Sequence, residues 1–95
     1  MVPLVFLHGF TGSSKSWNEL RNKLNFSSKA IDCPGHGNNL IKDLSTLYTF
    51  EDWQKEFNLN LHLNNLEKIN LCGYSMGGRL AISFASAFPK KIKSL

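Results

Sequence analysis

The sequence of 95 residues has little cysteine, no long apolar run and no basic cluster, and each shortage excludes a class of protein. Its two cysteines, Cys33 and Cys72, show neither CxxC nor Cys/His spacing, so we expect reduced thiols and no zinc site. No apolar run approaches the ~18 residues of a membrane span, and the N-terminal segment lacks the marks of a signal peptide. The net charge of +4 is not gathered into a basic run with interleaved aromatic residues. We therefore expect a cytoplasmic protein with neither a membrane nor a nucleic acid as partner.

Apolar runs and helical repeats alternate along the chain. Short apolar runs without polar alternation are typical of strands that are covered on both faces, as in a parallel sheet. The expected strands are 2–7, 28–32 and 67–73, the expected helices are 16–24, 49–63 and 76–88, and 90–95 approach a fourth strand. Such alternation predicts crossover units and a single small α/β domain, in which helices cover both faces of a three-layer parallel sheet. No regular element is expected over 38–48.

Two helix starts carry recognisable capping signals. Ser16 is followed three residues later by Glu19, which is the spacing of a capping box. Thr49 has Asp52 at the same spacing, directly before a run with apolar residues at helical intervals. The sequence therefore predicts helices capped by Ser16 and Thr49.

A serine lies at the junction of the third expected strand and the third expected helix, in Gly73-Tyr74-Ser75-Met76-Gly77. A Gly-x-Ser-x-Gly pattern in this context is typical of a nucleophile elbow, in which the serine adopts a strained conformation at a helix N-terminus. Gly73 and Gly77 would remove side chains that collide with the neighbouring strand and helix, and Gly78 would permit closer packing. The alternative is a serine in an ordinary tight turn.

The segment His8-Gly9-Phe10 comes directly after the first expected strand. An oxyanion hole needs two N–H donors aimed at one point. The Met76 N–H can supply one donor and the Phe10 N–H the other, with Gly9 letting the backbone come close. We interpret His8 as a structural histidine that bonds its own loop, with a general base as the alternative.

Three further polar residues are candidates for the site. Asp32 could bond backbone N–H groups of the Pro-Gly turn that comes after it, and a catalytic role is the alternative. His36 is interpreted as a residue that fixes the same loop. Arg79 lies one helical turn after Ser75 and could bind a substrate carboxylate with two hydrogen bonds, or it could be a surface arginine paired with a loop.

Three motifs occur in order, FLHGFTGSSKSW, IDCPGHG and LCGYSMGGRLA, and together they resemble the α/β-hydrolase superfamily. The arginine directly after the double glycine is similar to the 2-succinyl-6-hydroxy-2,4-cyclohexadiene-1-carboxylate synthase family of menaquinone and phylloquinone biosynthesis. That resemblance implies a lyase that eliminates pyruvate from a small-molecule carboxylate, without a metal or organic cofactor, in the cytoplasm (or the plastid stroma of an alga). A serine esterase or thioesterase of the same fold remains the alternative.

The resemblance also implies roles for individual residues. Ser75 would be the serine of a catalytic triad, and the backbone N–H groups of Phe10 and Met76 would form the oxyanion hole. Tyr74 and Arg79 would contact the substrate, with Arg79 binding a carboxylate.

The chain departs from the family beyond the serine. The superfamily order is serine, then an acid, then histidine. Here every histidine precedes Ser75, and no aspartate or glutamate comes after it. We therefore expect residues 1–95 to be the N-terminal portion of a hydrolase domain, without its cap, acid and base, and inactive alone. An unpaired apolar sheet edge would make it marginally stable or prone to aggregation. A non-catalytic remnant is the alternative.

Overall fold

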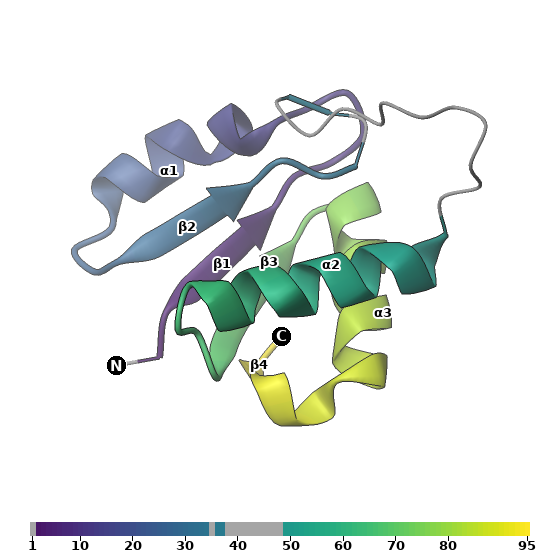
Figure 1. Cartoon of the computed structure of the whole chain (residues 1–95). Coiled ribbons are helices and arrows are strands. Elements are labelled where there is room, and N and C mark those ends of the chain that lie inside the picture. The colour runs from purple at the N-terminus through teal and green to yellow at the C-terminus, as the bar shows by residue number, and fades with distance from the viewer. Residues whose placement is uncertain (1, 35, 38–48) are drawn as a thin grey trace.

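Four parallel strands form one sheet in the computed structural model, which describes residues 2–34, 36–37 and 49–95 (Figure 1). The strands are β1 (Leu4–Leu7), β2 (Ser28–Ile31), β3 (Ile69–Gly73) and β4 (Ile92–Ser94), and their spatial order is β2-β1-β3-β4. The three predicted strands and the approach to a fourth are therefore confirmed. The irregular segment expected at 38–48 lies outside the described residues.

Helical segments connect the strands. They are the 3₁₀ turn η1 (Ser14–Trp17), the helices α1 (Asn18–Lys23), α2 (Phe50–Leu63) and α3 (Met76–Ala87), and the short turn η2 (Pro89–Lys91). All strand pairs are parallel, as strand–helix–strand crossovers require. β1 and β3 lie side by side at the centre of the sheet, so the loops that leave their carboxyl ends are neighbours.

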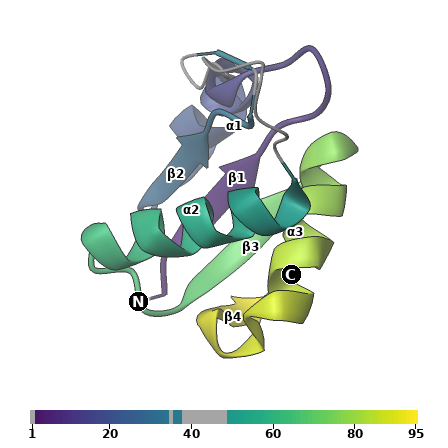
Figure 2. The same cartoon turned by 45° about the vertical axis from the view of Figure 1, so that its right-hand side comes forward.

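Helices cover both faces of the sheet, as expected. Side chains of β1 alternate between the two faces. Phe6 stacks on Trp17 of η1 with ring centroids 4.5 Å apart, whereas Val5 and Leu7 are buried in the core cluster on the other face. Figures 1 and 2 show α2 in front of the sheet and α1 behind it. The sheet is therefore the middle layer of three.

An aromatic cluster joins α2 to α3 on the Val5 face of the sheet. Trp53 and Phe57 stack with centroids 5.0 Å apart, and Phe84 meets Phe57 edge to face at 4.7 Å. Each such pair contributes about 0.5–1.5 kcal/mol beyond the area it buries. The cluster therefore fixes α3, and with it the turn at its N-terminus, against the sheet.

The start of α2 agrees with the sequence. The Thr49 hydroxyl accepts the Asp52 N–H at 3.2 Å, and the Asp52 carboxylate accepts the Thr49 N–H at 2.9 Å. The predicted capping box is thus confirmed. The Thr49 N–H donating to the Asp52 carboxylate also lowers the pKa of Asp52.

The capping box predicted at Ser16 and Glu19 is wrong. The helical segment begins earlier, at a 3₁₀ turn whose cap is Ser13. The Ser13 hydroxyl accepts the Lys15 N–H, and the Ser16 hydroxyl accepts the Ser13 N–H at 3.1 Å. Ser16 therefore closes the box instead of opening it. The serines at 13, 14 and 16 allow a capping box to begin at more than one position, and the box that forms begins at Ser13, at the 3₁₀ turn.

The edge strand β4 is short, and its register with β3 is irregular between Ile69 and Asn70. None of the helices within 2–34, 36–37 and 49–95 is long and apolar enough to cross a membrane.

Candidate active site

Ser75 occupies a strained turn between β3 and α3. Its backbone angles are φ 54° and ψ −112°, a combination that an L-residue adopts at a cost of about 1–3 kcal/mol. Ser75 is exposed and stands directly before the first residue of α3, Met76. A helix N-terminus carries N–H groups without intrahelical partners and a favourable dipole for an anion. The serine is therefore presented to solvent where negative charge would be stabilised.

Two of the three glycines around Ser75 have no room for a side chain. A Cβ on Gly73 would lie 2.7 Å from the Gly78 nitrogen, and a Cβ on Gly77 would lie 2.5 Å from the His8 carbonyl oxygen. Both neighbours are backbone atoms that cannot rotate away. Gly78 was expected to permit closer packing of the helix, but a Cβ there would lie 3.4 Å from the Gly73 oxygen, an ordinary contact. The missing side chain at Gly77, and not the one at Gly78, therefore lets α3 approach β1 closely.

The first turn of α3 continues the elbow. The Gly77 N–H donates to the Tyr74 carbonyl at 2.9 Å, and the Arg79 N–H donates to the Ser75 carbonyl at 3.0 Å. Arg79 is exposed and lies one turn along the helix from the serine. These bonds fix the backbone on which the serine and the arginine stand.

The loop after β1 forms a tight turn beside the elbow. The Gly12 N–H donates to the Gly9 carbonyl at 3.0 Å, so Phe10 and Thr11 occupy the two corner positions. Thr11 has a positive φ of 65°, which is unusual for a β-branched residue. The Tyr74 N–H donates to the Leu7 carbonyl at 3.0 Å, and this bond joins the ends of β3 and β1. The loop that carries Phe10 is thereby attached to the turn that carries Ser75.

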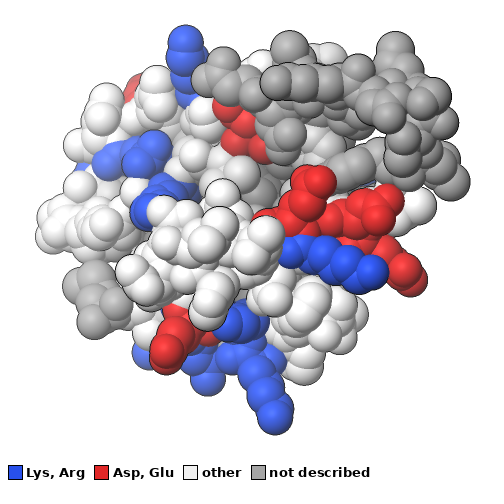
Figure 3. Space-filling model, viewed as in Figure 1, with Lys and Arg blue, Asp and Glu red and all other residues white. Residues whose placement is uncertain are grey.

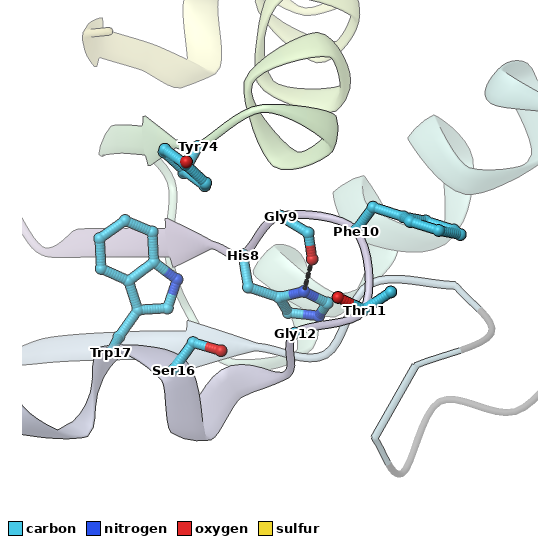
Figure 4. Close-up of a pocket in the computed structure, with 8 residues that line it drawn as sticks. All are labelled: His8, Gly9, Phe10, Thr11, Gly12, Ser16, Trp17 and Tyr74. Atoms are coloured by element: carbon cyan, nitrogen blue, oxygen red, sulfur yellow. Dashed lines mark hydrogen bonds between the residues drawn. The ribbon is translucent and has the colours of Figure 1, made fainter.

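A cavity of about 390 Å³ lies between this loop and Tyr74 (Figure 4). The Tyr74 ring covers Gly9, where an added Cβ would lie 2.8 Å from a ring carbon. Phe10 is 72% exposed and projects away from Trp17 in Figure 4. The residues that line the cavity are His8, Gly9, Phe10, Thr11, Gly12, Ser16, Trp17 and Tyr74. Ser75 is not among them, so the cavity adjoins the serine without containing it.

His8 is fully buried and bonds the backbone through both ring nitrogens. The Cys33 N–H donates to Nε2 at 2.9 Å, and Nδ1 lies 2.7 Å from the Gly9 carbonyl oxygen. Because an N–H can only donate and a carbonyl can only accept, this pattern requires a neutral ring protonated on Nδ1. Such a histidine connects the loops that leave β1 and β2 and has no nitrogen left for a substrate proton.

His36 has the same bonding pattern at the surface of these loops. The Thr11 N–H donates to Nε2 at 3.2 Å, and Nδ1 lies 2.9 Å from the Pro34 carbonyl oxygen. Asp32 was expected to bond the Pro-Gly turn after it, and Gly35 of that turn lies outside the described residues. Within them, the Asp32 carboxylate accepts the Ser14 N–H at 2.7 Å. Both side chains therefore connect the loop after β2 to the loop after β1.

A second cavity, of about 370 Å³, touches the elbow at Met76. Its lining is mainly apolar and consists of Pro34, Thr49, Phe50, Trp53, Met76 and Leu80.

The described residues contain no group of three or more His, Cys, Asp or Glu that could hold a metal. Lysine and arginine side chains lie at separate places on the face shown in Figure 3, with acidic side chains among them.

Sequence reasoning missed the part played by Thr11. The signal was the Thr-Gly pair at 11–12, which is typical of a turn, but a positive φ would have been assigned to the glycine. It also missed that the Cys33 N–H bonds His8, because the two residues are 25 positions apart and meet only when β1 and β2 pair.

The chain is similar in sequence to a known protein family and to several curated proteins. The family model of the α/β-hydrolase fold matches residues 2–95. A 2-succinyl-6-hydroxy-2,4-cyclohexadiene-1-carboxylate synthase of Yersinia enterocolitica is 37% identical over 83 residues, which cover 86% of this chain and 29% of the relative. A Bacillus subtilis protein provisionally named as the same synthase is 44% identical over 98 residues, covering 97% of this chain and 34% of its own length.

Solved structures agree on the fold. Naproxen esterase from Bacillus subtilis superposes with a TM-score of 0.83 at 28% identity, over 98% of this chain and 33% of the esterase. An esterase from a marine microorganism gives a TM-score of 0.81 at 33% identity, over 97% of this chain and 35% of its own. The chain thus spans about a third of the length of the proteins it matches. Because the family model matches residues 2–95, the chain belongs to the α/β-hydrolase fold family.

Proposed function

We propose that this chain supplies the nucleophile elbow and oxyanion hole of a lyase of the 2-succinyl-6-hydroxy-2,4-cyclohexadiene-1-carboxylate synthase type. The observation that carries the proposal is Ser75 in its strained turn at the head of α3, with exposed Arg79 one helical turn later. The names of two relatives, from Bacillus subtilis and Yersinia enterocolitica, support the choice of reaction.

The proposed chemistry is proton abstraction and then elimination of pyruvate. Negative charge develops on a substrate carbonyl oxygen when the proton leaves, and the N–H groups of Phe10 and Met76 stabilise that oxyanion. One such donor is worth about 3–4 kcal/mol in the transition state. Ser75 takes the substrate proton while its own hydroxyl proton passes to the histidine of a triad, whose acid and histidine belong to the remaining two thirds of the family's fold.

Arg79 is the proposed carboxylate ligand. The product named for the relatives is itself a carboxylate with a succinyl arm, so the substrate carries more than one negative charge. A guanidinium can bind a carboxylate through two parallel hydrogen bonds, which a lysine cannot reproduce. A hydrogen bond to a charged group contributes about 1.5–3 kcal/mol, so we expect loss of Arg79 to raise KM about ten- to a hundredfold.

A chimera tests the proposal. Residues 2–95 replace the matching segment of the Yersinia enterocolitica relative, which then supplies the acid and base, and pyruvate release is measured with lactate dehydrogenase. We expect turnover that Ser75→Ala abolishes. Arg79→Ala should raise KM, Arg79→Lys should recover only part of the loss, and Lys68→Ala, which removes an exposed cation before β3, should have no effect. A folded chimera that releases no pyruvate would contradict the proposal.

An esterase is the second candidate, and the apolar cavity at Met76 favours it. A cavity lined by Trp53, Phe50 and Leu80 suits the hydrocarbon part of an ester better than a polyanion. The structural similarity to two esterases points the same way. Efficient cleavage of p-nitrophenyl esters by the chimera without pyruvate release would favour this candidate. A folded chimera inactive in both assays would favour the non-catalytic alternative.

A further inference from the structure

We propose that His36 is a positioning residue that holds the Phe10 turn in the conformation an oxyanion hole needs. The inference rests on the proposed role of the Phe10 N–H. The hydrogen bond that carries it runs from the Thr11 N–H to His36 Nε2, over 3.2 Å, between loops that leave different strands. His36 acts through the neighbouring residue and has no contact with the reacting atoms in this arrangement.

The turn needs such a support because it is strained. Thr11 has φ 65°, and left-handed backbone costs an ordinary L-residue about 1–2 kcal/mol. The bond from the Gly12 N–H to the Gly9 carbonyl closes the turn without using the Thr11 N–H. His36 Nε2 accepts that N–H, so relaxation of Thr11 toward a negative φ would break a cross-loop hydrogen bond. Since Phe10 directly precedes Thr11 in the turn, such relaxation would also change the direction of the Phe10 N–H.

The ring of His36 is itself fixed in the orientation this requires. Its Nδ1 donates to the Pro34 carbonyl at 2.9 Å, which leaves Nε2 unprotonated and free to accept. The ring also meets the Phe10 ring edge to face, with centroids 5.6 Å apart. Two contacts, one polar and one aromatic, therefore connect His36 to the corner of the turn. Variants can separate them.

Three substitutions distinguish the hydrogen bond from the packing. His36→Gln places an amide oxygen where Nε2 lies and keeps the acceptor, His36→Phe keeps the ring and removes the acceptor, and His36→Ala removes both. His62→Gln, at an exposed histidine in the last turn of α2, is the matched control. If the hydrogen bond positions the turn, the His36→Gln variant should behave like the wild type. The His36→Phe variant should then behave like His36→Ala.

The first readout is NMR on the ¹⁵N-labelled chain, which does not depend on activity. We expect a scalar coupling across the hydrogen bond between the Thr11 nitrogen and His36 Nε2, with His36 protonated on Nδ1. The Phe10 and Thr11 amide signals should move in the Phe and Ala variants and stay near their positions in the Gln variant. A folded chain with no such coupling, or with amide signals indifferent to all three variants, would overturn the proposal.

The second readout is the activity of the chimera with the Yersinia enterocolitica relative. A displacement of a catalytic group by about 1 Å can cost up to about a hundredfold in rate, so we expect kcat to fall about tenfold or more in His36→Phe and His36→Ala, with KM nearly unchanged. His36→Gln should restore kcat. Equal activity of all variants would refute the positioning role. If the NMR pattern holds while even the unmodified chimera is inactive, the proposed function fails and the support of the turn by His36 stands.

Discussion

Adjacent glycines at the start of α3 should respond to alanine in opposite directions. At Gly77 the added methyl group would lie 2.5 Å from the His8 carbonyl oxygen and 2.6 Å from the Leu7 carbonyl carbon. These are main-chain atoms of β1 and its loop, so α3 would have to move away from the sheet. Overpacking of a tight site costs about 1–3 kcal/mol, and two backbone contacts place this case near the upper end, at about 3 kcal/mol.

At Gly78 the same methyl group would lie 3.4 Å from the Gly73 oxygen and 3.7 Å from its carbonyl carbon, which are ordinary contacts that need no displacement. Alanine also loses less conformational entropy than glycine when a helix forms. Gly78→Ala should therefore stabilise the fold by about 0.5 kcal/mol. In a chain of this size 1 kcal/mol shifts Tm by about 4–8 °C, so the two variants should differ by roughly 15 °C or more.

Urea titration monitored by far-UV circular dichroism gives the free energies of unfolding of the wild type and both variants. The two substitutions change the same atoms at consecutive positions, so each serves as the control for the other. A Gly77→Ala variant as stable as the wild type would show that α3 can move without cost. A Gly78→Ala variant that loses more than Gly77→Ala would refute the packing argument altogether.

Backbone strain and burial lead to two further predictions. Ser75→Gly should raise the free energy of unfolding by about 1–3 kcal/mol relative to Ser75→Ala, because only glycine relieves φ 54° at that turn, and paired urea titrations measure the difference. Equal stabilities would show that the turn is unstrained. Burial raises the pKa of the Cys33 thiol to about 11 from an ordinary 9.0. Because the folded pKa lies above the unfolded one, its contribution to stability is complete below about pH 9 and is lost as the pH rises through 11. The unfolding free energy should therefore fall between pH 8 and 11 by more in the wild type than in Cys33→Ala, and Cys33 should react with a thiol reagent more slowly than half-buried Cys72. A parallel pH dependence in both proteins, or faster labelling of Cys33, would contradict this.

The local signals of the sequence were enough to predict the strands and most of the helix boundaries. An unbroken apolar run predicted β1, short strand-like segments predicted β2 and β3, and helical spacing with the Thr49 cap predicted α2. Where two short-range signals competed, at Ser13 and Ser16, the sequence could not choose, because both registers satisfy the same capping rule. Side-chain periodicity therefore predicts the elements better than it predicts where each one begins.

The candidate site was found from the sequence through one motif, and its supports came from the structure. Gly-x-Ser-x-Gly after an apolar run indicated the elbow at Ser75, since its glycine spacing is set by local geometry. The roles of His8 and His36 depend on residues up to 25 positions away, Cys33 and Thr11. No pattern in the sequence states which of these loop residues will bond one another.

The sequence by itself determined the order of strands and helices along the chain and the position of the serine turn, because these depend on neighbouring residues. It also shows directly that no histidine or acidic residue follows Ser75 in the 95 residues. Only the tertiary structure decided that Gly77 and not Gly78 is the close contact. It also decided that Thr11 is the strained corner of the Phe10 turn and that both loop histidines bond the backbone. The physical reason is that parallel pairing of β1 with β2 and β3 brings distant loops to one edge of the sheet, where distances of a few tenths of an ångström decide which atoms bond and which collide.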